Sequence, residues 1–328
     1  MKLAVYKNTL VAFCLTLALL AIPANAVVNE LVGSSESHSI EKFDNNGNWI
    51  KTFASTGPYV VNGLAASPVT GDVFATTNTP TILRYTKTGA AFGPKGSYWS
   101  SFNLSSLVGS NTIDSVLFDS SGNLYVATYY GTGGYQVVII RFAAKEILKA
   151  SPTSSGTIAT NLNRGFQMAW DVYGDLCLAS WDSETVQCFN PGTGALVFDY
   201  ASEMKGLLEP GGLAFGPDNI LTVSDLFTGE VWVEAVPRQG PMNELASGMV
   251  HDVYALAADN SGALYLPSFH NPEGRYEGQY PYDCTYYACM DGDFSSDLVY
   301  KIDPATGAVT NFIATHIWGP YQMIFVPF

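Results

Sequence analysis

Polar residues at the starts of predicted strands are the residues of this sequence best suited to chemistry. Carboxylate and carboxamide oxygens are the ligands that calcium prefers, and it takes about six to eight of them. Asn62 and Asp114 are therefore expected to bind a metal, and calcium is the one cofactor that the sequence indicates. With these two residues, four more at such positions are expected to line a ligand site: Gln167, Asp252, Tyr254 and Gln322.

A second group of candidates falls in segment 269–297, which is rich in tyrosine, cysteine and aspartate. Tyrosine rings offer amphipathic contact area to sugars or proteins, and clustered carboxylates suit calcium. The alternative is a loop whose rings pack against the rest of the fold. On the first interpretation Tyr276, Tyr280 and Tyr286 bind a ligand, and Asp291, Asp293 and Asp297 form a second calcium site.

The signatures of common catalytic sites do not occur in the sequence. It contains no His-Glu-x-x-His, no Gly-x-Ser-x-Gly and no Gly-Lys-Ser/Thr phosphate loop. His251 and Asp252 are an acid/base pair in type, but adjacent residues on a strand point to opposite sides. Whether the protein is an enzyme therefore stays open.

Residues 1–26 are predicted to be a signal peptide. Lys2 and Lys7 precede an apolar run from residue 10 to 22, and Ala24-Asn25-Ala26 has the small-x-small pattern of a cleavage site. A membrane anchor is the alternative, but the run is shorter than the roughly 20 residues that span a bilayer. The mature chain should begin near Val27 and be secreted or periplasmic, with no transmembrane segment.

Cysteine spacing agrees with an oxidising compartment. Cys177 and Cys188 are equidistant from a predicted turn at Asp182-Ser183, which would place them opposite each other on adjacent strands and joined by a disulfide. Cys284 and Cys289 would close a small loop. A zinc site is the rival interpretation of the second pair, but no further cysteine or nearby histidine completes one.

The composition is that of a β-protein. Only 13% of residues are charged, and there are 31 Gly and 17 Pro, which suits many short strands joined by turns. Short helices are expected only at 143–150 and 202–208. The net charge of -14 opposes binding to nucleic acid or to an anionic membrane, since both are polyanions.

A strand, turn, strand pattern recurs along the chain about every 45 to 50 residues, the length of one propeller blade. The copies span residues 62–77, 114–128, 166–180, 211–225 and 254–268, and most are followed by a third strand. A turn residue suited to a left-handed backbone sits in each: Gly71, Gly122, Gly174, Asn219 and Gly262.

The two ends of the chain complete the pattern. The segment 321–328 resembles a first strand without partners, and 27–32, 39–43 and 49–53 resemble second, third and fourth strands without a first. Joined, they would close the ring and remove exposed strand edges. We therefore predict one all-β domain over residues 27–328, a six-bladed β-propeller of four-stranded antiparallel blades. A β-sandwich and a seven-bladed ring are the alternatives.

The repeats, such as SVLFDSSGNLYVAT and GGLAFGPDNILTVSD, resemble six-bladed propellers of the NHL-repeat and SMP-30/gluconolactonase-like kind over nearly all of the mature chain. The resemblance implies a divalent-metal site, to which Asn62, in Asn62-Gly63-Leu64-Ala65-Ala66-Ser67-Pro68, and Asp114 correspond by type and spacing. The sequence departs from that pattern because it has no Glu-Gly-Pro-x-Trp counterpart to supply the family's metal-binding Glu.

Two functions follow from these observations. The first is a secreted propeller that binds a ligand, a glycan or a protein partner through the channel mouth and the Tyr-rich loop. The second is a calcium-dependent hydrolase or lyase that acts on a lactone or a related small molecule. Because the loop joins a second strand to a third, it should emerge on the same side of the ring as Asn62 and Asp114.

Overall fold

The structure is a computed structural model, and it describes residues 28–34, 38–91, 101–108, 112–130, 136–149, 152–154, 156–163, 165–181, 183–200, 206–226, 228–239, 241–247, 253–268, 298–315, 317 and 320–327. Within these ranges no helix is long and apolar enough to cross a membrane.

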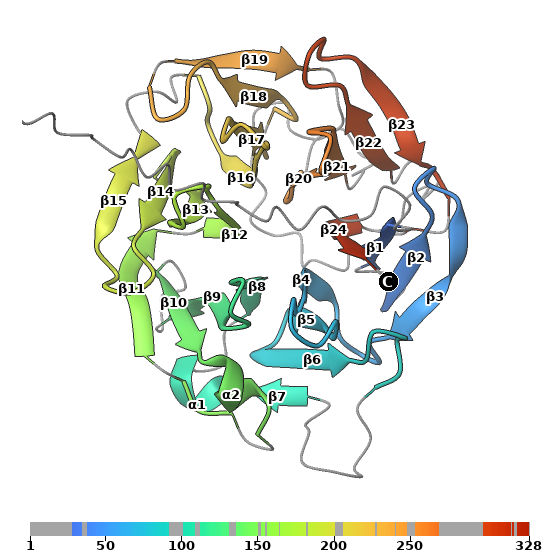
Figure 1. The fold of residues 1–328 in the computed structure, drawn as a ribbon, viewed down its shortest axis with the longest axis vertical. Helices are drawn as coiled ribbons and strands as arrows, with labels where there is room; N and C mark the ends of the chain where they lie inside the picture. The colour runs from blue at the N-terminus through green and yellow to red at the C-terminus, as the bar shows by residue number, and fades with distance from the viewer. Residues whose placement is uncertain are drawn as a thin grey trace, which may run out of the picture.

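Six four-stranded antiparallel sheets are arranged as blades around a central axis (Figure 1). The fold is therefore the predicted six-bladed propeller. Blade 1 consists of β4 (Val61–Ala66), β5 (Val73–Thr77), β6 (Thr81–Tyr85) and β7 (Ser101–Asn103). Blade 2 consists of β8 (Ile113–Phe118), β9 (Leu124–Tyr130), β10 (Gln136–Phe142) and β11 (Gly156–Asn163). Blade 3 consists of β12 (Gly165–Trp170), β13 (Leu176–Ser180), β14 (Thr185–Phe189) and β15 (Leu196–Asp199).

The other half of the ring contains the closure. Blade 4 consists of β16 (Pro210–Phe215), β17 (Leu221–Asp225), β18 (Val231–Glu234) and β19 (Met242–Ala246). Blade 5 consists of β20 (Ala257–Ala258), β21 (Leu264–Ser268), β22 (Leu298–Ile302) and β23 (Val309–Ile313). Blade 6 combines β24 (Pro320–Pro327) with β1 (Val28–Ser34), β2 (Ser39–Phe43) and β3 (Trp49–Ser55). In it, β24 pairs antiparallel with β1 from Val28 opposite Pro327 to Ser34 opposite Pro320, which confirms the predicted closure.

The predicted turns are also confirmed. Gly71, Gly122, Gly174 and Gly262 have φ values between 73° and 87°, and Asn219 has φ 64°. A positive φ strains most side chains, so glycine and asparagine fit these positions. Asn219 adds a bond between blades, because its Oδ1 accepts a hydrogen bond from the Val172 backbone nitrogen at 2.8 Å.

The hydrophobic core lies between blades rather than at one centre. Each buried cluster combines neighbouring sheets; one of them joins Phe74 and Ile82 of blade 1 to Val126 and Phe142 of blade 2. Burying one such side chain contributes about 1.5 to 3 kcal/mol. A blade therefore buries apolar side chains against its neighbours in the ring, as stacked repeats do.

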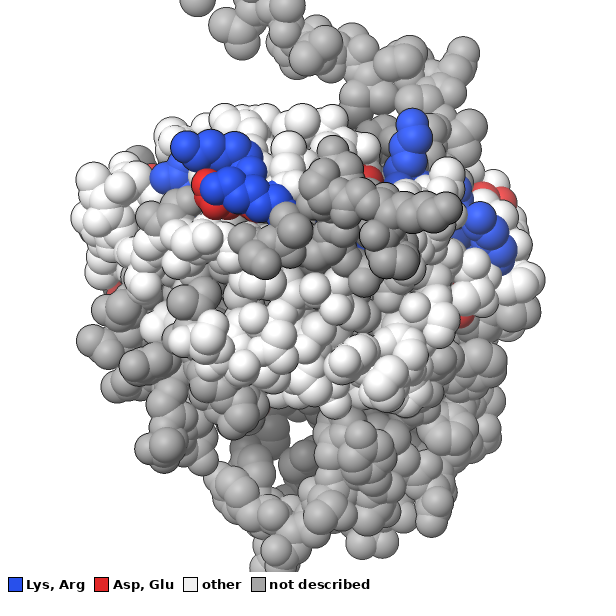
Figure 2. Space-filling model, turned by 90° about the horizontal axis from the view of Figure 1, so that it is seen from below, with Lys and Arg blue, Asp and Glu red and all other residues white. Residues whose placement is uncertain are grey.

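The structure differs from the sequence prediction in detail. The first strand of blade 5 is only the two residues of β20. The expected helix at 143–150 shortens to α2 (Ala144–Ile147), and a second short helix, α1 (Ser105–Val108), was not anticipated. Of the expected helix at 202–208, only 206–208 lie among the described residues, and these form no helix. The Lys and Arg side chains visible on one side of the disc gather near one rim (Figure 2).

Candidate ligand site at the channel mouth

The inner strands all begin at one end of the ring's central axis, which we call the channel mouth or, in short, the mouth. Strands alternate in direction within each blade, so second strands end at the mouth and third strands begin there. The register shows this directly: Val61, which begins β4, lies opposite Thr77, which ends β5, and Ile113 of β8 lies opposite Thr128 of β9. The mouth is therefore the end of the ring where the predicted polar residues begin their strands.

Asn62 and Asp114 lie on adjacent inner strands. The Asn62 Nδ2 donates a hydrogen bond to the Ile113 carbonyl oxygen at 3.3 Å, and both Asn62 and Asp114 are half-buried. Because the amide nitrogen is used in this bond, the Asn62 carbonyl oxygen is the atom suited to receive a ligand. Amide and carboxylate oxygens are donors of the kind that calcium takes, but these two residues supply only part of the roughly six to eight oxygens that it needs, and no further ligand is identified among the described residues.

Gln167 fastens three blades together. Its Oε1 accepts hydrogen bonds from the backbone nitrogens of Leu213 in blade 4 and Leu256 in blade 5, each at 2.9 Å. Its Nε2 donates to the Leu256 carbonyl oxygen, also at 2.9 Å. The side chain can span two blades because Gly212, between them, has no side chain: an added Cβ would lie 2.6 Å from the Leu256 nitrogen. Gln167 was predicted to bind a ligand. The hydrogen bonds described for its side chain are instead to backbone groups of neighbouring blades.

Gln322 occupies the matching place across the ring. Its Oε1 accepts a hydrogen bond from the Leu64 backbone nitrogen at 2.7 Å. Gly63 leaves room for it, because a Cβ there would lie 3.1 Å from that oxygen and 2.5 Å from Thr76 Oγ1. The sequence contains a pattern for this bond between blades that was not recognised in advance. An aromatic-Gln-Met triplet, at 166–168 and again at 321–323, lies one blade ahead of a Gly-Leu-Ala triplet, at 212–214 and 63–65.

The remaining candidates are placed only in part. Tyr254 is half-buried and directly precedes the strand region of blade 5, at the mouth. Ser268, which ends β21, pairs with Leu298, which begins β22, so the segment 269–297 leaves and rejoins the ring at the mouth. The following predicted site residues lie outside the described residues: Asp252, Tyr276, Tyr280, Tyr286, Asp291, Asp293, Asp297, Cys284 and Cys289.

Charge is distributed unequally between the two ends of the channel. Every described Lys and Arg lies in the half of its blade away from the mouth: Lys42, Lys51, Arg84, Lys87, Arg141, Lys145, Lys149, Arg238 and Lys301. The described strand ends and connections at the mouth carry carboxylates instead: Asp114, Glu184, Asp199, Glu209, Asp225 and Glu230. Several of these accept hydrogen bonds from neutral donors, as Asp225 does from the backbone nitrogen of Leu208 at 2.6 Å. The described part of the mouth is thus polar and acidic.

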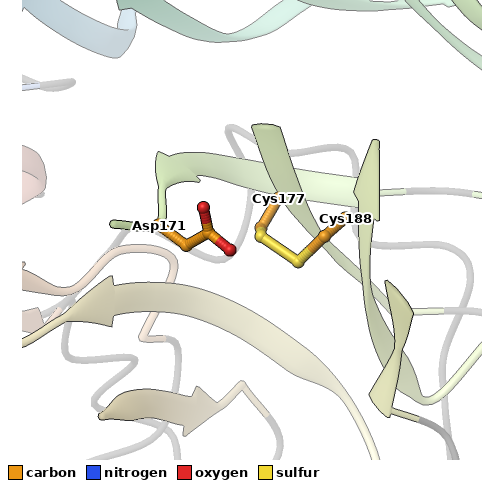
Figure 3. A group of neighbouring side chains, drawn as sticks. All are labelled: Asp171, Cys177 and Cys188. Carbon is orange, nitrogen blue, oxygen red and sulfur yellow. A yellow bond between two sulfur atoms is a disulfide. The ribbon is translucent and has the colours of Figure 1, made fainter. Parts of the chain in front are cut away.

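The predicted disulfide between Cys177 and Cys188 is confirmed. The two residues face each other on β13 and β14, with their Cα atoms 3.9 Å apart. The Asp171 carboxylate lies beside them, and one of its oxygens and both sulfurs are within 4.8 Å of one another (Figure 3). Among the described residues this is the one such group of His, Cys, Asp or Glu. Its sulfurs are bonded to each other and are not thiolate ligands for a metal.

Comparison with known proteins shows the fold and no family. No protein-family model and no curated protein matches the chain. A solved structure of a Bacteroides caccae protein of unknown function is 13% identical, with a TM-score of 0.61 over 92% of this chain and 99% of that one. A chain of a nidogen/laminin complex is 15% identical, with a TM-score of 0.62 over 91% and 98%. A streptogramin B lyase is 12% identical, with a TM-score of 0.54 over 87% and 83%. At sequence identities this low, the structural likeness shows a shared fold and nothing about function.

Proposed function

We propose that this chain is a secreted propeller that binds a glycan at the channel mouth, with the Tyr-rich segment 269–297 forming part of the site. The proposal rests on one observation: the mouth is polar, and glutamine side chains that bond backbone groups of other blades hold the ring together around it. Asn62, Asp114 and Tyr254 are half-buried there, while Gln167 and Gln322 hold the inner strands together. Preorganised polar groups on a rigid support are what a binding site requires.

The charge distribution supports a neutral or cationic ligand over an anionic one. No Lys or Arg among the described residues lies at the mouth, and carboxylates there would repel phosphate or sulfate groups. Hydroxyl groups of a neutral sugar can instead donate to carboxylate and amide oxygens. Tyrosine rings complete such a site by stacking on the apolar faces of sugar rings.

The starting point of segment 269–297 supports its part in binding. Ser268 and Leu298, which flank it, are paired at the mouth, so a loop of this length begins and ends beside the inner strands. Long loops on rigid scaffolds often carry the function of a fold. The disulfide between Cys177 and Cys188 agrees with an oxidising, extracellular setting.

A glycan array probed with the labelled mature protein tests this function. Wild type should bind a defined set of neutral glycans, and Asn62→Ala or Tyr276→Ser should weaken that binding about tenfold, the effect of losing one good contact of about 1.4 kcal/mol. Val69→Ser, on the exposed turn at the opposite face, is the control and should bind normally. If no glycan binds above background, or if binding survives changes at the mouth, the proposal is wrong and a protein partner becomes the better candidate.

The second candidate is a calcium-dependent hydrolase or lyase acting on a lactone or related small molecule. It is supported by the neighbouring positions of Asn62 and Asp114 on adjacent inner strands, and one structural neighbour with this fold is a streptogramin B lyase. Calorimetric titration with calcium separates the two candidates. A site with micromolar affinity that Asp114→Asn abolishes would favour the enzyme, whereas absence of calcium binding with retained glycan binding would favour the lectin-like function.

A further inference from the structure

One position of the blades has a repeated chemistry that blade 3 lacks. In blades 1, 2 and 5, an aromatic residue of the second strand lies opposite a basic residue of the third: Phe74 with Arg84, Tyr125 with Arg141, and Tyr265 with Lys301. The cations lie over the rings, at 5.4, 6.0 and 5.1 Å from the ring centroids. In blade 3 the same register position is filled by Cys177 and Cys188. Blade 3 therefore has a disulfide where blades 1, 2 and 5 have a cation and its aromatic partner, while blade 4 has Thr222 opposite Val233 there.

Blade 3 has the carboxylate but not the arginine of an ion pair that blade 1 forms. In blade 1, Asp72 immediately precedes the second strand and forms a buried ion pair with Arg84, whose Nη2 lies 2.5 Å from Asp72 Oδ2. Asp175 occupies the same place before β13 in blade 3. In blade 3, however, Cys188 occupies the register position that Arg84 occupies in blade 1. A buried carboxylate without a counter-charge is costly, so another residue must supply the positive charge.

Arg238 of blade 4 supplies it from the turn between β18 and β19. Its Nη2 lies 2.7 Å from Asp175 Oδ2 and also bonds Asp171 Oδ2. The guanidinium packs over two aromatic rings of blade 3, with its Cζ 4.6 Å from the Tyr173 ring centroid and 5.4 Å from that of Phe198. The Arg238 backbone has φ 53°, a conformation that disfavours arginine. The local strain is thus tolerated where the side chain bridges two blades.

Asp171 connects Arg238 to the disulfide. Its side chain is fully buried, and its Oδ1 accepts hydrogen bonds from the backbone nitrogens of Tyr173 at 3.0 Å and Asp175 at 2.8 Å. Its Oδ2 accepts a hydrogen bond from Arg238 Nη2. One of its carboxylate oxygens lies within 4.8 Å of the two sulfurs, which Figure 3 shows beside it. The disulfide, the carboxylate and the guanidinium are therefore one contiguous group.

We propose that Cys177–Cys188 and Arg238 form a redox-sensitive lock across the seam between blades 3 and 4. With the disulfide intact, the β13–β14 hairpin holds the turn that presents Asp171 and Asp175 to Arg238. A small dithiol reductant transfers two electrons to the disulfide: its own two sulfurs become joined, and its two thiol protons end on Cys177 and Cys188. The hairpin then loses its cross-link, so the neighbouring turn that carries Asp171 and Asp175 is held less firmly against Arg238. Reduction therefore loosens the seam.

A double-mutant cycle on the full mature chain tests whether the two parts act together. Arg238→Gln in the oxidised protein should lower Tm by about 5 to 10 °C, because it leaves buried carboxylates unpaired. The same change in a Cys177→Ala/Cys188→Ala background should lower Tm by less than half as much, since the hairpin no longer holds the carboxylates in place. If the two losses add, the lock does not exist as one unit.

The rate at which dithiothreitol reduces the disulfide gives a second, independent test. Arg238→Gln should speed reduction about tenfold, because the seam opens more often. The matched control is Arg84→Gln, which breaks the corresponding buried ion pair in blade 1 and should leave the rate unchanged. If Arg238→Gln does not fold, Arg238→Lys keeps the charge but loses the fork, and it should give a smaller acceleration. Equal rates for the Arg238 and Arg84 variants would overturn the proposal.

Discussion

Replacing Gln167 by Leu should destabilise the ring more than any other single change at the mouth that keeps side-chain volume. Leucine is close to glutamine in size, so the effect isolates the carboxamide. Two buried backbone donors, those of Leu213 and Leu256, would lose their shared acceptor, and the Leu256 carbonyl oxygen would lose its donor. An unsatisfied buried donor costs about 1 to 3 kcal/mol, so we expect a loss of roughly 2 to 6 kcal/mol.

Urea unfolding followed by tryptophan fluorescence measures this loss as a shift in midpoint at constant m-value. Gln322→Leu is the matched control: one backbone donor, that of Leu64, bonds its Oε1, so about 1 to 3 kcal/mol should be lost. A free energy of unfolding for Gln167→Leu within about 0.5 kcal/mol of wild type, or a larger loss for Gln322→Leu, would contradict this prediction.

Three further predictions concern the ring. Gly63→Ala should destabilise the protein by about 1 to 3 kcal/mol in the same assay, because the added Cβ would lie 2.5 Å from Thr76 Oγ1 and 3.0 Å from the Asp114 carbonyl oxygen; unchanged stability would show that the strands yield freely. Burial raises the pKa of Tyr85 and of Tyr125 to about 12, whereas the unfolded value is about 10, so the stability that these two tyrosines contribute should be constant below about pH 10 and fall as pH rises towards 12. Thermal melts at pH 8, 10 and 11 check this, and Tyr85→Phe should make the fall shallower. Deleting residues 321–328 should abolish cooperative unfolding of the whole ring, since β24 is the inner strand of blade 6; a truncated protein that melts like the full one would contradict the closure.

The fold was predictable because its signals are local and repeated. Turn residues such as Gly122 and Asn219 can be recognised from the sequence because their residue type suits a left-handed backbone. The strands at the two ends of the chain each lack partners, which predicts that they pair with each other. The cross-strand position of Cys177 and Cys188 followed from counting outward from one turn. Elements defined by tertiary packing were harder to predict: β20 is short, and α1 has no strong sequence signal.

The positions of the candidate site residues could be predicted from the sequence, but the contacts that their side chains make could not. Counting strand starts located Asn62, Asp114, Gln167 and Gln322 at the mouth. It could not show that the two glutamines bond backbone groups of other blades, because those partners are as much as 258 residues away in sequence. Arg238 was missed for the same reason: its partners, Asp171 and Asp175, belong to a different blade.

The claim that the mouth binds a glycan is tested most directly by comparing binding and stability in the same variants. An oligosaccharide selected on the glycan array is titrated into wild type, Asn62→Ala, and the triple variant Tyr276→Ser/Tyr280→Ser/Tyr286→Ser, and each protein is melted in parallel. We predict that both variants lose binding about tenfold or more while their melting temperatures stay within about 2 °C of wild type. Undiminished binding, or a loss of binding that only accompanies a large fall in melting temperature, would contradict it.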